Sequence, residues 1–346
     1  MKSKKHVTFI LFCVITLLLV GFAYAEPIKL RFNYSMPLKK SIAGSWHWYG
    51  DQVEKQTNGK VKFEYHPMGG LFKPKQTRDN MIAGTADLCN LSISTEGPRM
   101  PLASITSLPT IIFPNTVEGT MAASNAAVQL IDEFPDLAAE FKDFKIIAYQ
   151  YLTAYGVFMK TPALVPSDLK GKKIRAAAMH AEFVKSVGGG PVNIVPPKVY
   201  MSLKTGVIDG SIMSISQIKD YKLWEISKSF TDTYMGRSMF AIIMNKESWN
   251  ALPKDIQQVM DGLSDDMVRK GAEIMHSETS EGEKLYQEAG GKILKPTPEQ
   301  EKAWNDAKAP LENIWLENVR KKGKGEIGEK MLKRFKEIAA ENTKNL

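Results

Sequence analysis

The stretch DLKGKKIRAAAMHAEFVKSVGGGPVNIVPPKVYMSLKTGVIDGSIM, residues 168–213, contains the pattern that decides the fold. Short apolar runs alternate in it with helical segments, and glycine follows each helix, which ends a helix without the steric penalty of a Cβ. The order β-α-β-α-β predicts an α/β fold with parallel strands covered by helices on both faces. The expected elements are a strand over 172–176, a helix over 180–187, a strand over 192–195, a helix over 197–204 and a strand that starts at 207.

Arg175 lies near the end of the first of these strands. In open α/β sheets, ligands bind outside the carboxyl ends of the strands, so this position favours a binding role. A guanidinium is always charged, and its planar fork of donors fits a carboxylate. Spacing alone leaves open the alternative of a surface arginine in a basic turn, because Lys170, Lys172 and Lys173 precede it.

The segment from residue 28 to residue 91 shows the same order of strands and helices, which predicts another α/β domain. Its expected strands cover 28–34, 60–65 and 86–91, and its helices cover 42–56 and 74–84. Further along, two runs over 144–160 are expected to carry the chain to the next sheet, and the strand 240–245 to bring it back. Helices are expected late in the chain, over 254–288, 298–319 and 326–340.

The first 25 residues read as a secretory signal peptide. Lysines precede an apolar run of about 16 residues, and Ala23-Tyr24-Ala25 is a small-x-small cleavage site. The alternative of a membrane anchor is disfavoured because a spanning helix needs roughly 20 apolar residues. We therefore expect export, with cleavage after Ala25.

Composition and the absence of motifs exclude several functions. The net charge of +8 includes three leader lysines and comes with no nucleic-acid-binding motif, so no nucleic acid partner is expected. Cys89 is the only cysteine outside the leader, so no internal disulfide is expected. No G-x-S-x-G, phosphate-loop, H-E-x-x-H or C-x-x-C pattern occurs, so we expect no catalytic residues, no metal site, no cofactor and no enzymatic activity.

Five stretches resemble one known family. Residues 168–175 and 187–210 are similar to the core of the solute-binding proteins of tripartite ATP-independent periplasmic (TRAP) transporters, the DctP family. The segments 65–92, 146–160 and 240–260 agree in the family's order. The resemblance implies a two-domain periplasmic binding protein fold, type II-like, with two α/β domains, a hinge and a long C-terminal helix.

This fold implies a division of the chain and a location for the site. Domain I is expected to contain residues 26–151 plus about 240–280, and domain II residues 152–239 plus about 281–346. The pocket is expected at the domain interface, with hinge closure around the solute.

The resemblance also implies individual ligand-binding positions. Arg175 matches the family's carboxylate-binding arginine. Tyr155 falls where sialic-acid-binding members have a second arginine, and Met213 where many members have an asparagine. The remaining expected positions are Pro196, near an often aromatic position, and Ser35 and Ser92, at positions that are polar or charged in sugar-acid-binding members.

Because Tyr155 and Met213 replace polar groups, the hypothesis is a monocarboxylate with an apolar or aromatic body. A ligand rich in hydroxyls would leave groups unpaired at about 1–3 kcal/mol each. The alternative is that both side chains belong to the core.

The implied function is an extracytoplasmic receptor in the periplasm that binds an organic acid and delivers it to the TRAP permease membrane subunits. The receptor is expected to be a monomer. Two alternatives stay open at this point: a receptor for a sensor kinase, and a secreted enzyme on the same fold.

Overall fold

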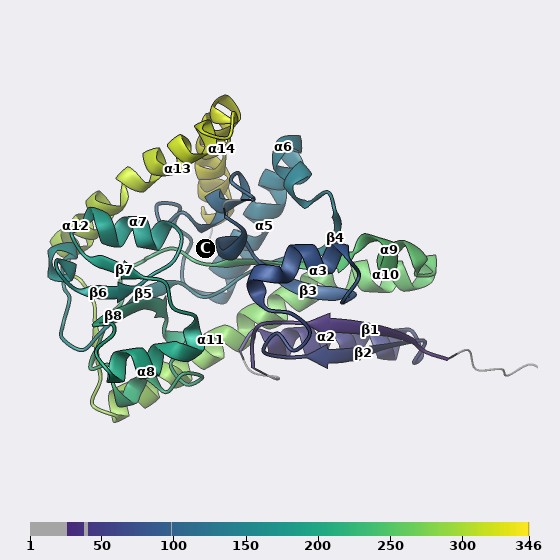
Figure 1. Ribbon diagram of the computed structural model, residues 1–346, viewed down its shortest axis with the longest axis horizontal. Coiled ribbons are helices and arrows are strands. Elements are labelled where there is room, and N and C mark those ends of the chain that lie inside the picture. The colour runs from purple at the N-terminus through teal and green to yellow at the C-terminus, as the bar shows by residue number, and fades with distance from the viewer. Residues whose placement is uncertain (1–25, 38–40, 98, 345) are drawn as a thin grey trace, which may run out of the picture.

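The computed structural model describes residues 26–37, 41–97, 99–344 and 346. The predicted signal peptide lies outside these residues. Within the described part, no helix is long and apolar enough to cross a membrane. Figure 1 shows two sheets side by side, each flanked by helices, which confirms the predicted α/β class.

The first sheet has the strand order β2-β1-β3-β10-β4. Strand β1 is parallel to both β2 and β3, as the pattern at 28–91 predicts. Strand β10 is antiparallel to β3 and β4, which confirms that the predicted strand at 240–245 returns to the first sheet. The strands are β1 (Ile28–Asn33), β2 (Val61–His66), β3 (Leu88–Ser92), β4 (Phe144–Tyr151) and β10 (Met239–Asn245).

The second sheet has the order β11-β9-β5-β8-β6-β7. Strand β6 is parallel to β7 and β8, so the β-α-β-α-β unit at 168–213 is confirmed. Strand β5 is antiparallel to β8 and β9. The strands are β5 (Tyr155–Met159), β6 (Lys173–Arg175), β7 (Gly190–Val192), β8 (Gly210–Ser214), β9 (Ser229–Thr231) and β11 (Lys292–Leu294).

Two strands of this unit are displaced from their expected positions. Strand β7 pairs through Gly190–Val192 rather than 192–195, because it is an edge strand in which Pro191 needs no ladder donor. Strand β8 begins at Gly210 rather than 207, because Asp209 is used at the turn. The backbone N–H of Asp209 donates to the carbonyl of Lys173, and the backbone N–H of Lys173 donates to the carboxylate of Asp209.

The first of the helices are α2 (Ala43–Gln56), α3 (Thr77–Ile82), α4 (Ile93–Glu96), α5 (Val117–Glu133), α6 (Pro135–Ala138), α7 (Met179–Ser186) and α8 (Val199–Lys204). Those late in the chain are α9 (Lys246–Ala251), α10 (Lys254–Gly262), α11 (Ser264–Glu288), α12 (Pro298–Lys308), α13 (Pro310–Arg320) and α14 (Gly325–Thr343). Two helices predicted as continuous are therefore broken. One break follows Gly262, a poor helix former, and the other precedes Pro310, which lacks an N–H.

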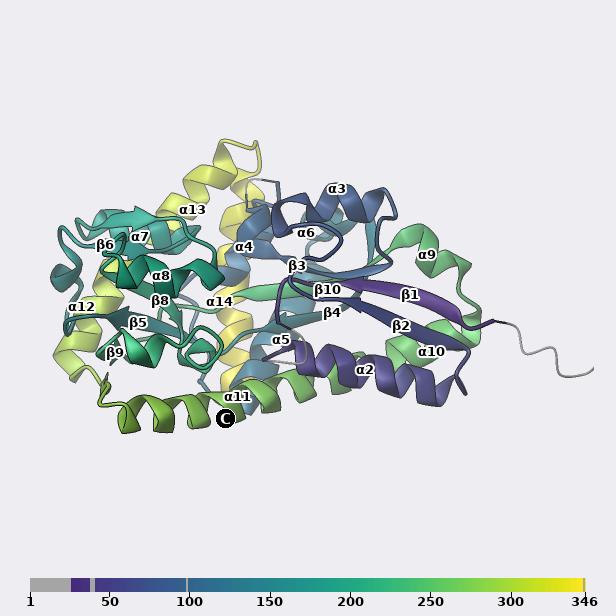
Figure 2. The same cartoon turned by 60° about the horizontal axis from the view of Figure 1, so that its bottom comes forward.

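Helix α11 connects the two sheets (Figure 2). It packs on α2 and β4 of the first sheet, and further along on the turn η7 (Ile215–Gln217) and β11 of the second. Gly271 permits the approach to the first sheet, because a Cβ there would lie 2.8 Å from Nε2 of Gln150. The chain also crosses between β4 and β5 and between β9 and β10, so three segments join the two halves.

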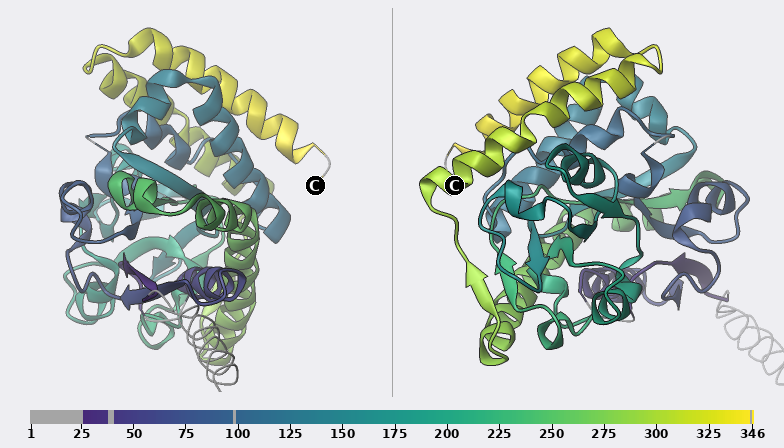
Figure 3. Two further views of the ribbon diagram at one scale, coloured as in Figure 1. Left: turned by 90° about the vertical axis from the view of Figure 1, so that its right-hand side faces the viewer. Right: turned by 60° about the vertical axis from the view of Figure 1, so that its left-hand side comes forward.

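The C-terminal helices run back over the molecule. Helix α13 packs on α7 of the second half and on α14, and α14 packs on α5, as Figure 3 shows. The predicted boundary at about residue 281 stays a prediction, since α14 contacts a helix that the sequence places in domain I.

Candidate functional site

A cavity of about 1220 Å³, which we name the cleft, opens between the two sheets. Its walls come from both halves of the molecule and from helix α13. The first half supplies residues that follow β1, β2 and β3, and the second half supplies residues around the ends of β6, β7 and β8. Loops at the carboxyl ends of strands therefore form most of the site, as expected for open α/β sheets.

Arg175 ends strand β6 and lines the cleft. Its Nε donates to the carbonyl of Ile194 and its Nη1 to the carbonyl of Ile212, each at 3.0 Å. Among the described residues no carboxylate pairs with it. Burial lowers the pKa of Arg175, but a guanidinium remains charged at neutral pH. The side chain is thus held rigidly, and its Nη2 makes no hydrogen bond to the described part of the protein.

Ala178 lies beside Arg175 in the cleft and precedes α7. Its φ of 49° and ψ of −131° are values that a residue with a Cβ rarely adopts. Such strain costs of order 1–3 kcal/mol and is found mainly at functional sites. Ala177 and Met179 line the cleft as well, so the strained turn places the start of α7 at the same cavity as Arg175.

Tyr155, the first residue of β5, also lines the cleft. Its ring stacks on His180 with 5.4 Å between centroids, and its hydroxyl bonds Ser238. His180 is held by the carbonyl of Met235. Burial lowers the pKa of His180 to about 4, with Arg175 contributing, so the imidazole is neutral at pH 7.

The expected first-half residues lie on the opposite wall. Ser35 follows β1, and its hydroxyl accepts a hydrogen bond from Nδ2 of Asn90 at 3.2 Å. Ser92 ends β3, and its hydroxyl lies 3.0 Å from that of Ser94. Pro196 lines the cleft from the segment that follows β7.

Met213 is the one expected site residue that does not line the cleft. Its side chain is fully buried in a hydrophobic cluster with Phe158, Phe230 and Tyr286. Both faces of β8 are covered, so the alternation of side chains along the strand puts Met213 on the face away from Ile212. Met213 is therefore a core residue, which is the alternative that the sequence left open.

Sequence reasoning missed several residues that line the cleft. Tyr221 has no sequence signal that separates it from a packing aromatic, and Gln217 has none because it lies in a turn. Trp315 comes from α13, 140 residues after Arg175, and no local pattern could have placed it there. Other lining residues that sequence reasoning missed include Lys73, Lys75, Ser94, Asn193, Phe240, Asn318, Lys321 and Lys322.

The charges of the lining favour an anionic ligand. Lys73, Lys75, Arg175, Lys321 and Lys322 line the cleft, and Glu182 is the only acidic side chain among the described lining residues. Glu182 pairs with Lys185 at 2.9 Å. Within the described chain, no three His, Cys, Asp or Glu side chains gather as metal ligands would. The arrangement can bind and orient a small anion.

Two α/β halves, joined by three segments around a cleft lined by cations, define the class of periplasmic binding proteins. The sequence model of the bacterial extracellular solute-binding proteins, family 7 (DctP), matches residues 32–321. The chain therefore belongs to this family of TRAP solute-binding proteins, which are receptors rather than enzymes. A C4-dicarboxylate-binding periplasmic protein of Rhodobacter capsulatus is 24% identical over 302 residues, covering 86% of this chain and 89% of its own.

Solved structures share the fold. A TRAP periplasmic solute-binding protein of Desulfovibrio salexigens is 26% identical, with a TM-score of 0.80 over 93% of this chain and 98% of its own. One from Rhodoferax ferrireducens, in complex with co-purified benzoate, is 21% identical, with a TM-score of 0.83 over 92% and 99%. One from Chromohalobacter salexigens with bound D-glucuronate is 19% identical, with a TM-score of 0.78 over 89% and 99%.

Proposed function

We propose that the protein is an extracytoplasmic receptor that binds an organic monocarboxylate in the cleft, with the carboxylate on Arg175. The observation that carries the proposal is the way in which the Arg175 guanidinium is held. It is oriented by two carbonyls, lacks an acidic partner among the described residues, and keeps Nη2 free of hydrogen bonds within them. A ligand carboxylate supplies the missing charge and accepts from the free nitrogen.

An apolar or aromatic body is proposed behind the carboxylate. Tyr155, Leu152, Phe240 and Met36 line the cleft, and Trp315 lines it from α13. The fold itself does not choose the ligand, because similar structures hold both benzoate and D-glucuronate. The choice rests on these side chains, because an aromatic or aliphatic body packs against apolar and aromatic groups.

We further propose delivery of the bound acid to the TRAP permease membrane subunits from the periplasm, after removal of the predicted signal peptide. The cleft exceeds the roughly 1,000 Å³ of the largest ligand pockets, so closure of the two halves about their three connections is proposed to enclose a small acid. The receptor is proposed to act as a monomer.

Calorimetric titration of the chain from residue 26, unfolded and refolded to remove any bound solute, tests the ligand class. Benzoate and phenylacetate are expected to bind, and D-glucuronate and succinate are not. Arg175→Gln is expected to weaken binding roughly 100-fold or more, because the ligand carboxylate loses its charged partner. The matched control is Arg269→Gln, which changes an exposed arginine outside the cleft.

Binding of D-glucuronate without binding of aromatic acids would show that the ligand class is wrong. An Arg175→Gln protein with the affinity of the unmodified chain would show that the carboxylate lies elsewhere.

A further inference from the structure

Two arginines with buried guanidinium groups have no carboxylate partner in the described part of the chain, and they line the same small cavity. They are Arg175 and Arg237. Arg269 also lacks an ion pair there, but it is exposed to solvent. The arginines that do form ion pairs are Arg31, Arg78, Arg99, Arg320 and Arg334.

Arg237 lies between β9 and β10, where the chain crosses back to the first sheet, and is 2% exposed. Its Nη1 donates to the hydroxyl of Thr120 at 2.8 Å and to the carbonyl of Leu152 at 3.2 Å. Its Nη2 donates to the carbonyl of Pro114 at 2.6 Å. Longer contacts of Nη2 reach the carbonyl of Phe113 and Oδ1 of Asn115. These five acceptors are neutral, the guanidinium also bonds the side chain of Tyr234, and Nε has no hydrogen-bond partner in the described chain.

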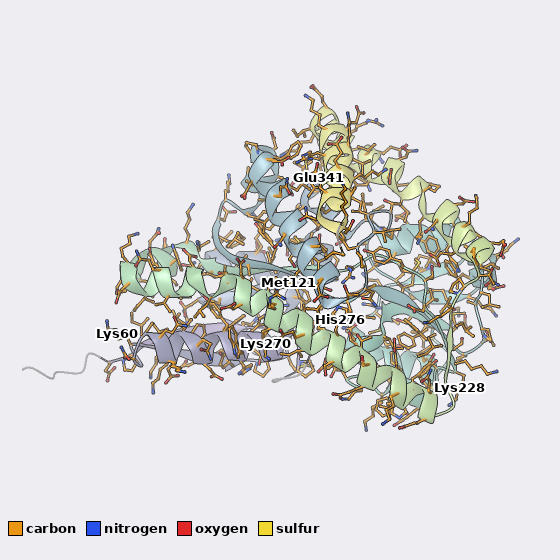
Figure 4. The ribbon with its side chains drawn as sticks, turned by 180° about the vertical axis from the view of Figure 1, so that it is seen from behind. Lys60, Met121, Lys228, Lys270, His276 and Glu341 are labelled. Atoms are coloured by element: carbon orange, nitrogen blue, oxygen red, sulfur yellow. The ribbon has the colours of Figure 1, made fainter. Side chains whose placement is uncertain are left out.

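The ionisable groups around Arg237 carry no compensating charge. Burial raises the pKa values of Tyr234 and Tyr151, so both hydroxyls are neutral. His276, on α11 in Figure 4, shares the hydroxyl of Thr120, and burial lowers its pKa to about 4. At neutral pH the guanidinium therefore keeps its whole positive charge away from water.

The cavity that Arg237 lines, which we name the rear cavity, has a volume of about 40 Å³. It continues the cleft behind Arg175, because the two cavities share Arg175, Tyr155 and Ser238 among their lining residues. Ser107 lines it too, and its buried hydroxyl has no partner. None of the described lining residues is acidic.

These features favour an anion over water as the occupant. An unpaired buried donor costs about 1–3 kcal/mol, and a buried charge without a counter-charge costs more. Water accepts hydrogen bonds but supplies no negative charge. By volume the rear cavity takes about three water molecules, which is also room for a halide ion or for one carboxylate group.

We propose that the rear cavity is a binding subsite for a small anionic group that only accepts hydrogen bonds. Arg237 and Ser107 hold it from one side, and Arg175 faces it from the cleft. The group comes from one of two sources, a free halide ion or the carboxylate of the bound organic acid. Only the second source rests on the proposed function.

The first arm of the test measures halide binding without any organic acid. Chloride or bromide is added to the refolded chain in sulfate buffer at constant ionic strength, and the melting temperature is recorded. A saturable rise in melting temperature is expected, with an anomalous bromide peak between Arg237 and Ser107 in a soaked crystal. Ser107→Ala is expected to raise the half-saturating halide concentration about tenfold, because it removes one charge-assisted hydrogen bond.

The matched control is Thr110→Val. Its hydroxyl is also buried without a partner, but Thr110 does not line the rear cavity. Arg237→Lys is a second variant that keeps the charge and loses the fork of donors. Arg237 donates to three backbone carbonyls, so Arg237→Lys is informative only if it folds. Ser107→Ala removes no hydrogen bond within the described protein, only the proposed one to the anion, and so keeps the test decisive.

The second arm measures benzoate affinity at low and high halide concentrations. If the carboxylate occupies the subsite, halide competes with benzoate, and Ser107→Ala weakens benzoate binding about tenfold. If a free halide occupies it, benzoate and halide bind together. The proposal is overturned if halide and sulfate act alike, no bromide peak is seen, and Ser107→Ala leaves benzoate affinity unchanged. A failure of benzoate to bind at all counts against the proposed function alone, since the first arm needs no organic acid.

Discussion

Arg31 and Arg175 lie on the central strands of two similar β-α-β-α-β units, β1 between β2 and β3, and β6 between β7 and β8. Arg31 has its own carboxylate, because its Nε donates to Oδ2 of Asp87 at 3.0 Å. Arg175 has two neutral carbonyls instead and faces the cleft. The difference teaches that Arg31, an arginine outside the cleft, is neutralised within its own sheet. The proposed ligand arginine is oriented but left to be neutralised by a solute.

The largest effect expected from this comparison is a different defect in each arginine variant, a loss of affinity in one and a loss of stability in the other. Arg175→Gln is expected to weaken ligand binding roughly 100-fold or more with little loss of stability. Arg31→Gln is expected to leave affinity unchanged and to cost about 2 kcal/mol of stability, because buried Asp87 loses its partner. Urea unfolding and calorimetric titration of both variants measure this, and a loss of affinity in Arg31→Gln would break the comparison.

The next effect compares two carboxyl groups. Hydrogen bonds from Arg31 and Ser248 outweigh burial and lower the pKa of Asp87. Glu278 on α11 has the opposite environment, since burial raises its pKa to about 7 from an ordinary value of 4.5. Its Oε1 accepts from the backbone N–H of Ser41 at 3.0 Å, and its Oε2 has no hydrogen-bond partner in the described chain.

Because the unfolded chain loses the Glu278 proton at lower pH than the folded chain, stability should fall as pH rises from about 4.5 to about 7. Asp220, Lys219 and Glu281 also act on this carboxyl group. The hydrogen bond between Lys219 and Glu281 raises the pKa of Lys219 and lowers the pKa of Glu281, which favours the charged form of both. Allowing for solvent screening, the loss is about 1 kcal/mol. Unfolding at several pH values should show this fall in the unmodified chain and less of it in Glu278→Gln. An equal slope in both proteins would refute the assignment.

A smaller effect is expected at Ala178, whose strained backbone stands beside Arg175. Ala178→Gly is expected to add up to about 1 kcal/mol of stability, because glycine adopts a positive φ without penalty but loses more entropy on folding. Ala177→Gly is the control, since that neighbour is not among the residues with positive φ and should be destabilised. A loss of stability in Ala178→Gly would mean that the turn stores no strain.

The smallest effect concerns the lysines of the cleft. Lys321 and Lys322 line it from the end of α13 and extend its positive charge beyond Arg175. Replacing both with glutamine is expected to slow association of benzoate about two- to fivefold at low salt, and less at high salt. Stopped-flow binding measures this. A matched change of Lys284, an exposed lysine outside the cleft, should leave the rate unchanged.

Sequence reasoning predicted the elements better than the site. Strands β1 and β6 and helix α2 were predicted within about two residues of their bounds, because their signals are local: side-chain alternation along a strand and glycine at the ends of the elements. Arg175 was predicted near the end of a strand and Tyr155 from the family resemblance, and both line the cleft. Met213 was not distinguishable from a cleft residue, because both faces of a covered strand are apolar.

By itself the sequence determined the α/β class, the order of the elements and a cationic residue at the carboxyl end of β6. Only the tertiary structure decided which side chains meet. Trp315 reaches the cleft because α13 folds back over α7, and Arg237 lies behind Arg175 because the returning segment crosses at that place. Local propensity acts over a few residues. That neither arginine has a carboxylate beside it among the described residues follows from contacts between segments far apart in the chain, and local propensity does not reach that far.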